Sequence, residues 1–162
     1  MSSLYSCCLG EPLKRSVGLL QHVMEKQWTD EEIEKSVGEL VRVNTPEEIE
    51  ALPLNTEAVF VSHLDDKKIE ALANLRKLRR LIQDGNCFVT DEGLRTLGTM
   101  ASLEEVDLEW GDDITDAGLV HLYGLNKLKW LDIGFCHSLT NQGIAKLKEN
   151  LPECEIIAER LL

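Results

Sequence analysis

The stretch ITDAGLVHLYGLNKLKWLDIGFC, residues 114–136, decides the fold because it recurs along the chain. Moving back 25 residues gives VTDEGLRTLGTMASLEEVDLEWG, which begins at Val89. Moving forward by the same step gives LTNQGIAKLKENLPECEII, which begins at Leu139, and a weaker copy, LDDKKIEALANLRKLRRLIQDGN, begins at Leu64. The apolar positions of the copies align in columns, and a fixed period of this length predicts a stacked repeat.

Each copy changes its hydrophobic period partway through. The first part, TDEGLRTLGTM in one copy, has the apolar spacing of a short helix, with threonine as a natural N-cap and a glycine early in the helix. The second part, LEEVDLEWG, alternates as a strand does. We therefore expect Leu81, Val106 and Leu131 to be buried in one ladder. The parallel strands should run in sequence order, near 58–62, 80–83, 105–108, 130–133 and 155–158.

The strand segment resembles the leucine-rich repeat pattern L-x-x-L-x-L-x-x-N/C, which Leu128, Leu131, Ile133 and Cys136 match in full. The ITDAGL element is similar to the cysteine-containing subclass of that family. The resemblance covers about residues 58–158. It implies an α/β fold, a short right-handed solenoid with a parallel concave sheet and a helical convex side, and it implies recognition and not catalysis. The ending LPECEII also resembles mitochondrial coupling-factor-B-like proteins.

The N-terminal third does not share the repeat. We expect a flexible tail over residues 1–10, a helical cap over 11–56 and about four repeats over 57–162. Within the cap, PLKRSVGLLQHVMEKQ has an apolar stripe, and WTDEEIEKSVGELVRV is expected to be a helix whose apolar face includes Val41. TPEEIEAL begins another helix, with Thr45 as N-cap and Pro46 in the first turn. A cap is required because the end of a solenoid exposes core side chains.

The composition and charge of the chain argue against several classes of function. The net charge of −12 argues against binding to a phosphate backbone, and the basic run RKLRR at 76–80 is best explained as a solvated turn. The chain shows no signal peptide and no membrane-spanning run, so we expect no membrane insertion. Five cysteines without a disulfide-framework spacing favour a reducing, cytoplasmic location. No catalytic motif is present, and we expect no enzyme activity and no cofactor.

The spacing of the cysteines and histidines does not predict a metal site. The four histidines are scattered, and zinc sites need closely spaced pairs. Cys136, at the Asn/Cys position of the repeat, should be buried, reduced and inert. Cys87 and Cys154 are also expected to serve packing, and Cys7 and Cys8 fall in the tail. Palmitoylation of the tail cysteines stays open.

The expected register brings aromatic and acidic residues together on the concave face, where exposed aromatics within charge are typical of an interface. The predicted partner-binding residues are Glu105, Asp107, Glu109, Trp110, Trp130, Asp132 and Phe135. Trp130 and Phe135 could instead simply cover the sheet. The partner is expected to be a protein with basic and apolar side chains.

Three functions follow from these observations. The first is a non-catalytic protein-interaction module that binds a partner on its concave face. The second, by the resemblance to factor-B-like proteins, is an assembly or coupling subunit of a larger membrane-associated complex. The third is a substrate adaptor of an F-box-type ubiquitin ligase, in which the N-terminal helices would dock on the ligase scaffold.

Overall fold

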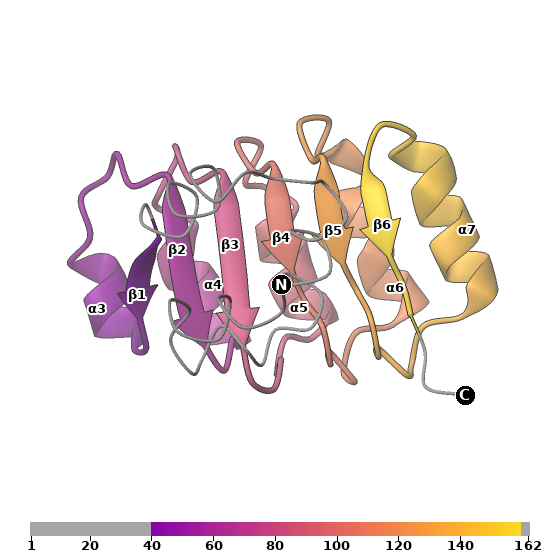
Figure 1. The fold of residues 1–162 in the computed structure, drawn as a ribbon, viewed down its shortest axis with the longest axis horizontal. Coiled ribbons are helices and arrows are strands. Elements are labelled where there is room, and N and C mark those ends of the chain that lie inside the picture. Colours follow the sequence, from indigo (N-terminus) through magenta and orange to yellow (C-terminus); the bar gives the residue numbers. More distant parts are fainter. Residues whose placement is uncertain (1–39, 160–162) are drawn as a thin grey trace, which may run out of the picture.

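Strands and helices alternate along residues 40–159, the part of the chain that the computed structural model describes. The strands are β1 Val41–Val43, β2 Ala58–Ser62, β3 Arg80–Asp84, β4 Glu105–Asp107, β5 Trp130–Asp132 and β6 Glu155–Ile157. The helices are α3 Pro46–Glu50, α4 Asp66–Leu72, α5 Asp91–Leu97, α6 Asp116–Leu119, the 3₁₀ helix η2 Val120–Gly124 and α7 Asn141–Asn150. The strands form one sheet in the order β1-β2-β3-β4-β5-β6, with every pair parallel (Figure 1).

The structure confirms the five predicted strands and their order. Leu81 pairs with Val106, and Val106 with Leu131. All three side chains are fully buried and belong to the main apolar core. The helices cover one face of the sheet (Figure 1). The α/β architecture is therefore that of repeated strand–helix units, compatible with a leucine-rich repeat. We call the opposite face of the sheet, which corresponds to the predicted concave face, the front face.

The first strand corrects the prediction for the N-terminal third. Val41, expected on the apolar face of a helix, lies in β1, which pairs in parallel with β2 from Val41↔Val59 to Val43↔Val61. The reason is the sequence Val-Arg-Val, in which β-branched residues favour extended backbone. Val43 is buried, while the Arg42 guanidinium lies over the Phe60 ring at 4.5 Å. The sheet thus begins within the segment expected to be a helical cap.

The helix expected after it is confirmed. Pro46 begins α3, and the Thr45 side chain accepts a hydrogen bond from the Glu48 N–H. The rest of the predicted cap, residues 11–39, and the predicted tail, residues 1–10, lie outside the described residues.

Consecutive units are joined on the helical side by an aspartate that reaches forward to the next unit. The Asp91 carboxylate accepts hydrogen bonds from both N–H and Oγ1 of Thr115, at 2.8 and 2.7 Å. The same two bonds join Asp66 to Thr90 and Asp116 to Thr140. We call these three joints the Asp–Thr ladder. Each threonine is also the N-cap of its own helix, so the ladder fixes where every following helix begins.

The early glycine of each repeat is required by the same joint. A Cβ on Gly118 would overlap Asp91 Oδ1, and a Cβ on Gly93 or Gly143 would overlap the corresponding aspartate. The glycine therefore makes room for the carboxylate of the preceding unit. At α4 the joint is different, since Lys68 stands at the glycine position and its ammonium donates to the carbonyls of Ser62 and His63.

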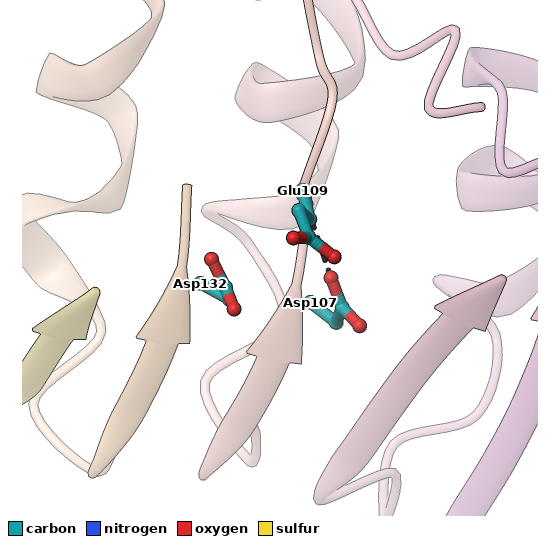
Figure 2. A group of neighbouring side chains, drawn as sticks. All are labelled: Asp107, Glu109 and Asp132. Carbon is teal, nitrogen blue, oxygen red and sulfur yellow. Dashed lines mark hydrogen bonds between the residues drawn. The ribbon is translucent and has the colours of Figure 1, made fainter. Parts of the chain in front are cut away.

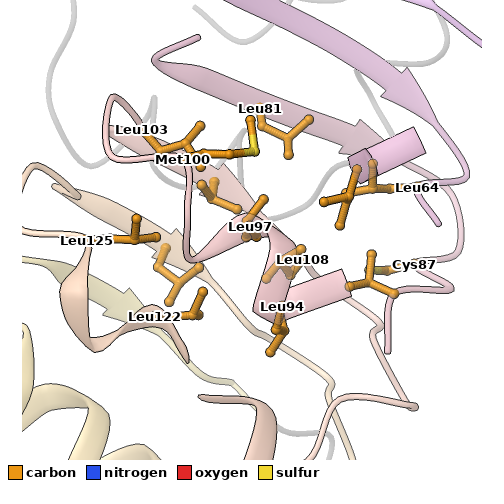
Figure 3. Close-up of a cluster of buried hydrophobic side chains, with 14 of the residues drawn as sticks. Leu64, Leu81, Cys87, Leu94, Leu97, Met100, Leu103, Leu108, Leu122 and Leu125 are labelled. Atoms are coloured by element: carbon orange, nitrogen blue, oxygen red, sulfur yellow. The ribbon is translucent and has the colours of Figure 1, made fainter. Parts of the chain in front are cut away.

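Between the sheet and the helices lies a continuous apolar core. Leucine columns from successive units interdigitate there, and Figure 3 shows the part around Leu81, Leu94, Leu97 and Leu108. Gln83 occupies a leucine column and is buried, and its amide Nε2 donates to the Glu109 carbonyl at 3.0 Å. This bond ties β3 to Glu109, in the turn after β4.

Candidate functional site

The predicted register of the front face is confirmed for its central pairs. Glu105 pairs with Trp130, and Asp107 with Asp132. The exposure of these residues differs from the expectation, because only Trp110, 37% exposed, is an open surface side chain. Glu105 and Phe135 are half-buried. The other four predicted binding residues are buried: Asp107, Glu109, Trp130 and Asp132.

Trp130 belongs to an apolar cluster on the front face. Its side chain is fully buried and packs with Phe60 and Ile82, and Leu40 and Ile157 pack against the same group. The prediction of an exposed indole at this position is therefore wrong. The alternative considered from the sequence, an aromatic that covers the sheet, describes Trp130 better.

Three carboxylates lie beside this cluster, at the ends of β4 and β5. One oxygen from each of Asp107, Glu109 and Asp132 lies within 4.8 Å of the others, and all three side chains are buried. Figure 2 shows Asp132 on β5 beside Asp107 on β4, with Glu109 after the strand end. Asp107 accepts a hydrogen bond from the Glu109 N–H at 3.0 Å, and Asp132 Oδ1 accepts one from the Gly134 N–H at 2.7 Å. We call this group the acidic cluster.

Electrostatics in the acidic cluster disfavour the ionised form of Asp132. Burial, and then the charge of Asp107, raises the pKa of Asp132 to about 7, although the hydrogen bond from Gly134 acts in the opposite direction. Asp132 Oδ2 has no hydrogen-bond partner. Buried like charges at this separation are stabilised by a shared proton or by a positive group. Carboxylate oxygens suit a hard cation, and they equally suit a lysine or arginine side chain.

A second feature lies at the rim of the front face, in the turns after the strands. Trp110 and Phe135 stack with ring centroids 4.4 Å apart. Both have positive φ, 66° and 56°, and so do His63 and Gly85, which hold the same position in earlier units. Only glycine adopts this backbone freely, and each other residue there costs about 1 kcal/mol. Sequence analysis missed this column, although Gly85 within it was the available signal.

The backbone explains why the turns are held in this conformation. The Trp110 N–H donates to the Gly134 carbonyl at 2.9 Å, and the Phe135 N–H donates to the Glu159 carbonyl at 2.8 Å. The parallel hydrogen-bond ladder thus continues beyond the strand ends and aligns the two rings. We call Trp110 and Phe135 the rim pair.

Near the opposite ends of the strands, the basic run is paired with acids. Arg79 and Lys129 both donate to the Glu104 carboxylate, at 2.7 Å each, and these bonds lower the pKa of Glu104 to about 2. Arg80 donates to Glu105 at 2.9 Å. Arg79 and Arg80 of the segment 76–80, predicted to be a solvated turn, are therefore paired with carboxylates of the next unit, and Arg80 is the first residue of β3.

The cysteines among residues 40–159 are free thiols. Cys136 is buried, as predicted, and its thiol lies 3.4 Å from the Leu108 carbonyl. Burial raises the pKa of Cys136 to about 12, which disfavours the reactive thiolate. Slow labelling of Cys136 by thiol reagents remains a prediction. Cys87 is also buried and Cys154 is half-buried.

Comparison with known families supports a leucine-rich repeat protein. The Leucine Rich repeat family model matches residues 99–122, which begin just after α5, include β4 and α6, and end within η2. That repeat is generally non-enzymatic and suggests a role in binding other proteins. No curated protein matches the chain. Within residues 40–159, no helix has the length and apolar character needed to cross a membrane.

Proposed function

We propose that the chain is a non-catalytic protein-interaction module whose partner binds at the rim of the front face. The rim pair carries this proposal. Two aromatic rings are stacked in a backbone conformation that costs free energy, and Trp110 is the more exposed of them. Strain of this kind at an exposed position indicates a functional constraint. Glycine would adopt this backbone conformation at a lower cost in free energy, so the fold alone does not require Trp110 and Phe135 at these positions.

The chemistry of the rim suggests the partner. Asp112 and Asp113 follow Trp110 and are exposed, and Glu159 lies next to Phe135 through its backbone. Aromatic faces beside carboxylates favour basic and apolar side chains, above all arginine, which can stack on a ring while it pairs with an acid. The rings would form the desolvated centre of the interface, and the acids would steer the encounter. We place the complex in the cytoplasm, where free thiols are stable.

Catalysis is not part of this proposal. A hollow of about 380 Å³ among the described residues lies at the α3–α4 end, lined mainly by apolar residues such as Leu52, Leu54 and Leu75. It lies away from the acidic cluster and lacks the converging polar groups of a reaction site. No observation in residues 40–159 favours the membrane-complex subunit or the ligase adaptor over a general binding module.

The experiment compares three forms of the full chain as affinity baits in a lysate of the source cells. Wild type and Arg95→Ala should retain the same partner, and Trp110→Ala should lose it. Arg95 is the control because it lies on the helical side, paired with the exposed Glu92. Titration of the purified partner should then show a loss of about 2 kcal/mol for Trp110→Ala, roughly 30-fold in Kd. Equal affinity of folded Trp110→Ala and wild type would refute the rim as the binding surface.

A further inference from the structure

A buried glutamine stands where the other units of the repeat have an apolar residue. Gln83 in β3 is 2% exposed. The same position of the neighbouring units is buried and apolar, and it is held by Val61, Leu108 and Ile133. The Gln83 side-chain oxygen, Oε1, has no hydrogen-bond partner within residues 40–159. A buried polar atom without a partner costs free energy, so packing of the core alone favours an apolar residue here.

The nitrogen of the same amide is bonded to the peptide unit that leads into the rim. Gln83 Nε2 donates to the Glu109 carbonyl at 3.0 Å, and the N–H of that peptide unit, which belongs to Trp110, donates to the Gly134 carbonyl at 2.9 Å. A peptide unit is planar, so bonds at its C=O and at its N–H together fix its orientation. The φ of 66° at Trp110 is the torsion that follows this unit. The two bonds therefore help to hold the indole in its strained conformation.

Gln83 makes this contact where the backbone pairing of β3 with β4 has ended. That pairing stops before Gln83, at Leu81↔Val106, whereas the pairing of β4 with β5 reaches the last residue of both strands. The turn after β4 is thus aligned by backbone pairing on the side of β5 and by a side chain on the side of β3. Leu108 holds the glutamine position in the next unit, and its side chain has no donor to give the Phe135 turn the same support.

We propose that Gln83 is a positioning residue of the rim pair. It holds the Glu109–Trp110 peptide so that the indole stays stacked on Phe135 and presents its exposed surface to a partner. A ring that is already fixed loses less conformational freedom when a partner binds, which strengthens binding. The use of the fixed ring rests on the proposed function, whereas the effect of the hydrogen bond on the turn does not.

The substitution Gln83→Met tests the proposal, because methionine has a similar length, suits an apolar core and lacks the N–H donor. Nuclear magnetic resonance of the full chain should show several-fold faster hydrogen exchange of the Trp110 N–H relative to the amides of β4 and β5. The ring protons of Phe135 should lose part of the upfield shift that stacking on Trp110 gives them. The urea midpoint should not fall, since the unpartnered Oε1 is removed as well.

The matched control is Leu81→Met, which lies on the same strand and in the same core and should leave the exchange and the ring shifts of the rim unchanged. Faster exchange confined to the rim in Gln83→Met supports the proposal. Unchanged exchange, or exchange that is faster by the same factor throughout the sheet, would overturn it, because Gln83 would then serve only packing. If Gln83→Met does not fold, Gln83→Leu, which restores the residue type of the column, takes the same measurements.

Binding separates this inference from the proposed function. The purified partner that the wild-type bait retains should bind Gln83→Met several-fold more weakly than wild type, with a smaller loss than for Trp110→Ala. If Trp110→Ala binds as wild type does, the proposed function fails, and the exchange measurements still decide the effect of Gln83 on the turn. If Trp110→Ala loses the partner while Gln83→Met, with an altered rim, keeps full affinity, the role of Gln83 in binding is overturned.

Discussion

The two sides of the sheet use carboxylates in opposite ways. On the helical side, each ladder aspartate accepts two hydrogen bonds from the threonine of the next unit, and the arrangement repeats at every joint from Asp66 to Asp116. On the front face, three carboxylates crowd together, and Asp132 Oδ2 accepts no hydrogen bond. The helical side thus pairs its carboxylates at every joint, whereas on the front face burial disfavours the ionised form of Asp132.

The largest loss of stability is expected when a methyl group is added at a joint of the Asp–Thr ladder. Gly118→Ala should destabilise the fold by about 3 kcal/mol, because the added methyl group overlaps Asp91 Oδ1 and either the carboxylate or the helix must move. Urea denaturation would measure the change. Gly124→Ala is the matched control, since a Cβ there meets nothing within 4 Å. Equal stability of the two variants would show that the joint is not tightly packed.

Removing the carboxylate of a joint should lower the stability somewhat less than filling the space beside its glycine. Asp91→Ala deletes both bonds to Thr115 and leaves its backbone N–H without this acceptor, at a cost of about 2 kcal/mol. A double-mutant cycle with Thr115→Ala should find positive coupling, since Thr115 Oγ1 is one of the two donors. Glu92→Ala, an exposed neighbour, serves as control. If the effects of the two substitutions are additive, the hydrogen bonds between Asp91 and Thr115 make no contribution of their own to stability.

On the front face, by contrast, removal of a carboxylate charge should increase the stability. The raised pKa of Asp132 means that the folded state holds a proton that the unfolded state releases. This group therefore causes stability to fall as the pH rises from about 4 to about 7, and the penalty stays constant above that range. Asp132→Asn removes the titration and should stabilise the chain at pH 8 by on the order of 2 kcal/mol.

The measurement for this prediction is chemical denaturation of wild type and Asp132→Asn at several pH values between 4 and 8. The difference in free energy of unfolding should grow with pH and then level off near pH 7. A difference that does not depend on pH, or one that shows Asp132→Asn to be less stable at pH 8, would mean that the ionised carboxylate is already compensated.

The smallest effect on stability is expected at the rim. Trp110→Gly removes the stacked ring but relieves the cost of a positive φ, and each contribution is about 1 kcal/mol. The free energy of unfolding should therefore change by less than about 1 kcal/mol, as thermal and urea denaturation can show. A large destabilisation would mean that the rim pair serves packing and not binding.

The sequence predicted the fold of the repeats well because their architecture is periodic. Leucine columns at fixed spacing specify which face of each strand is buried, and Leu81, Val106 and Leu131 lie as expected. The Thr-Asp-x-Gly element was recognised as a helix start, yet the hydrogen bonds that Thr115 donates to Asp91 were not foreseen. The repeat pattern shows which residues are equivalent in each unit, but it does not show which residues of neighbouring units are in contact.

The front face was predicted less well, for a physical reason. Register placed Trp130 beside Glu105, but it could not show that Trp130 is fully buried. Val41 was misassigned because Ile33, Val37, Leu40 and Val41 also have the spacing of a helical stripe, and the edge of β2 was not visible in the sequence. Local pattern determines the direction of a side chain within its element, whereas its exposure depends on residues far away.

The Asp–Thr ladder also has a direction. Each unit presents an acceptor to its successor, and Asn141 takes the aspartate position in α7, after which the described chain has one strand and no further helix. A segment such as 91–115 therefore carries one half of a joint at each end. Copying it in tandem would restore complementary halves of the joint at the new junction, so we expect whole units to be the natural step by which the repeat stack is lengthened or shortened.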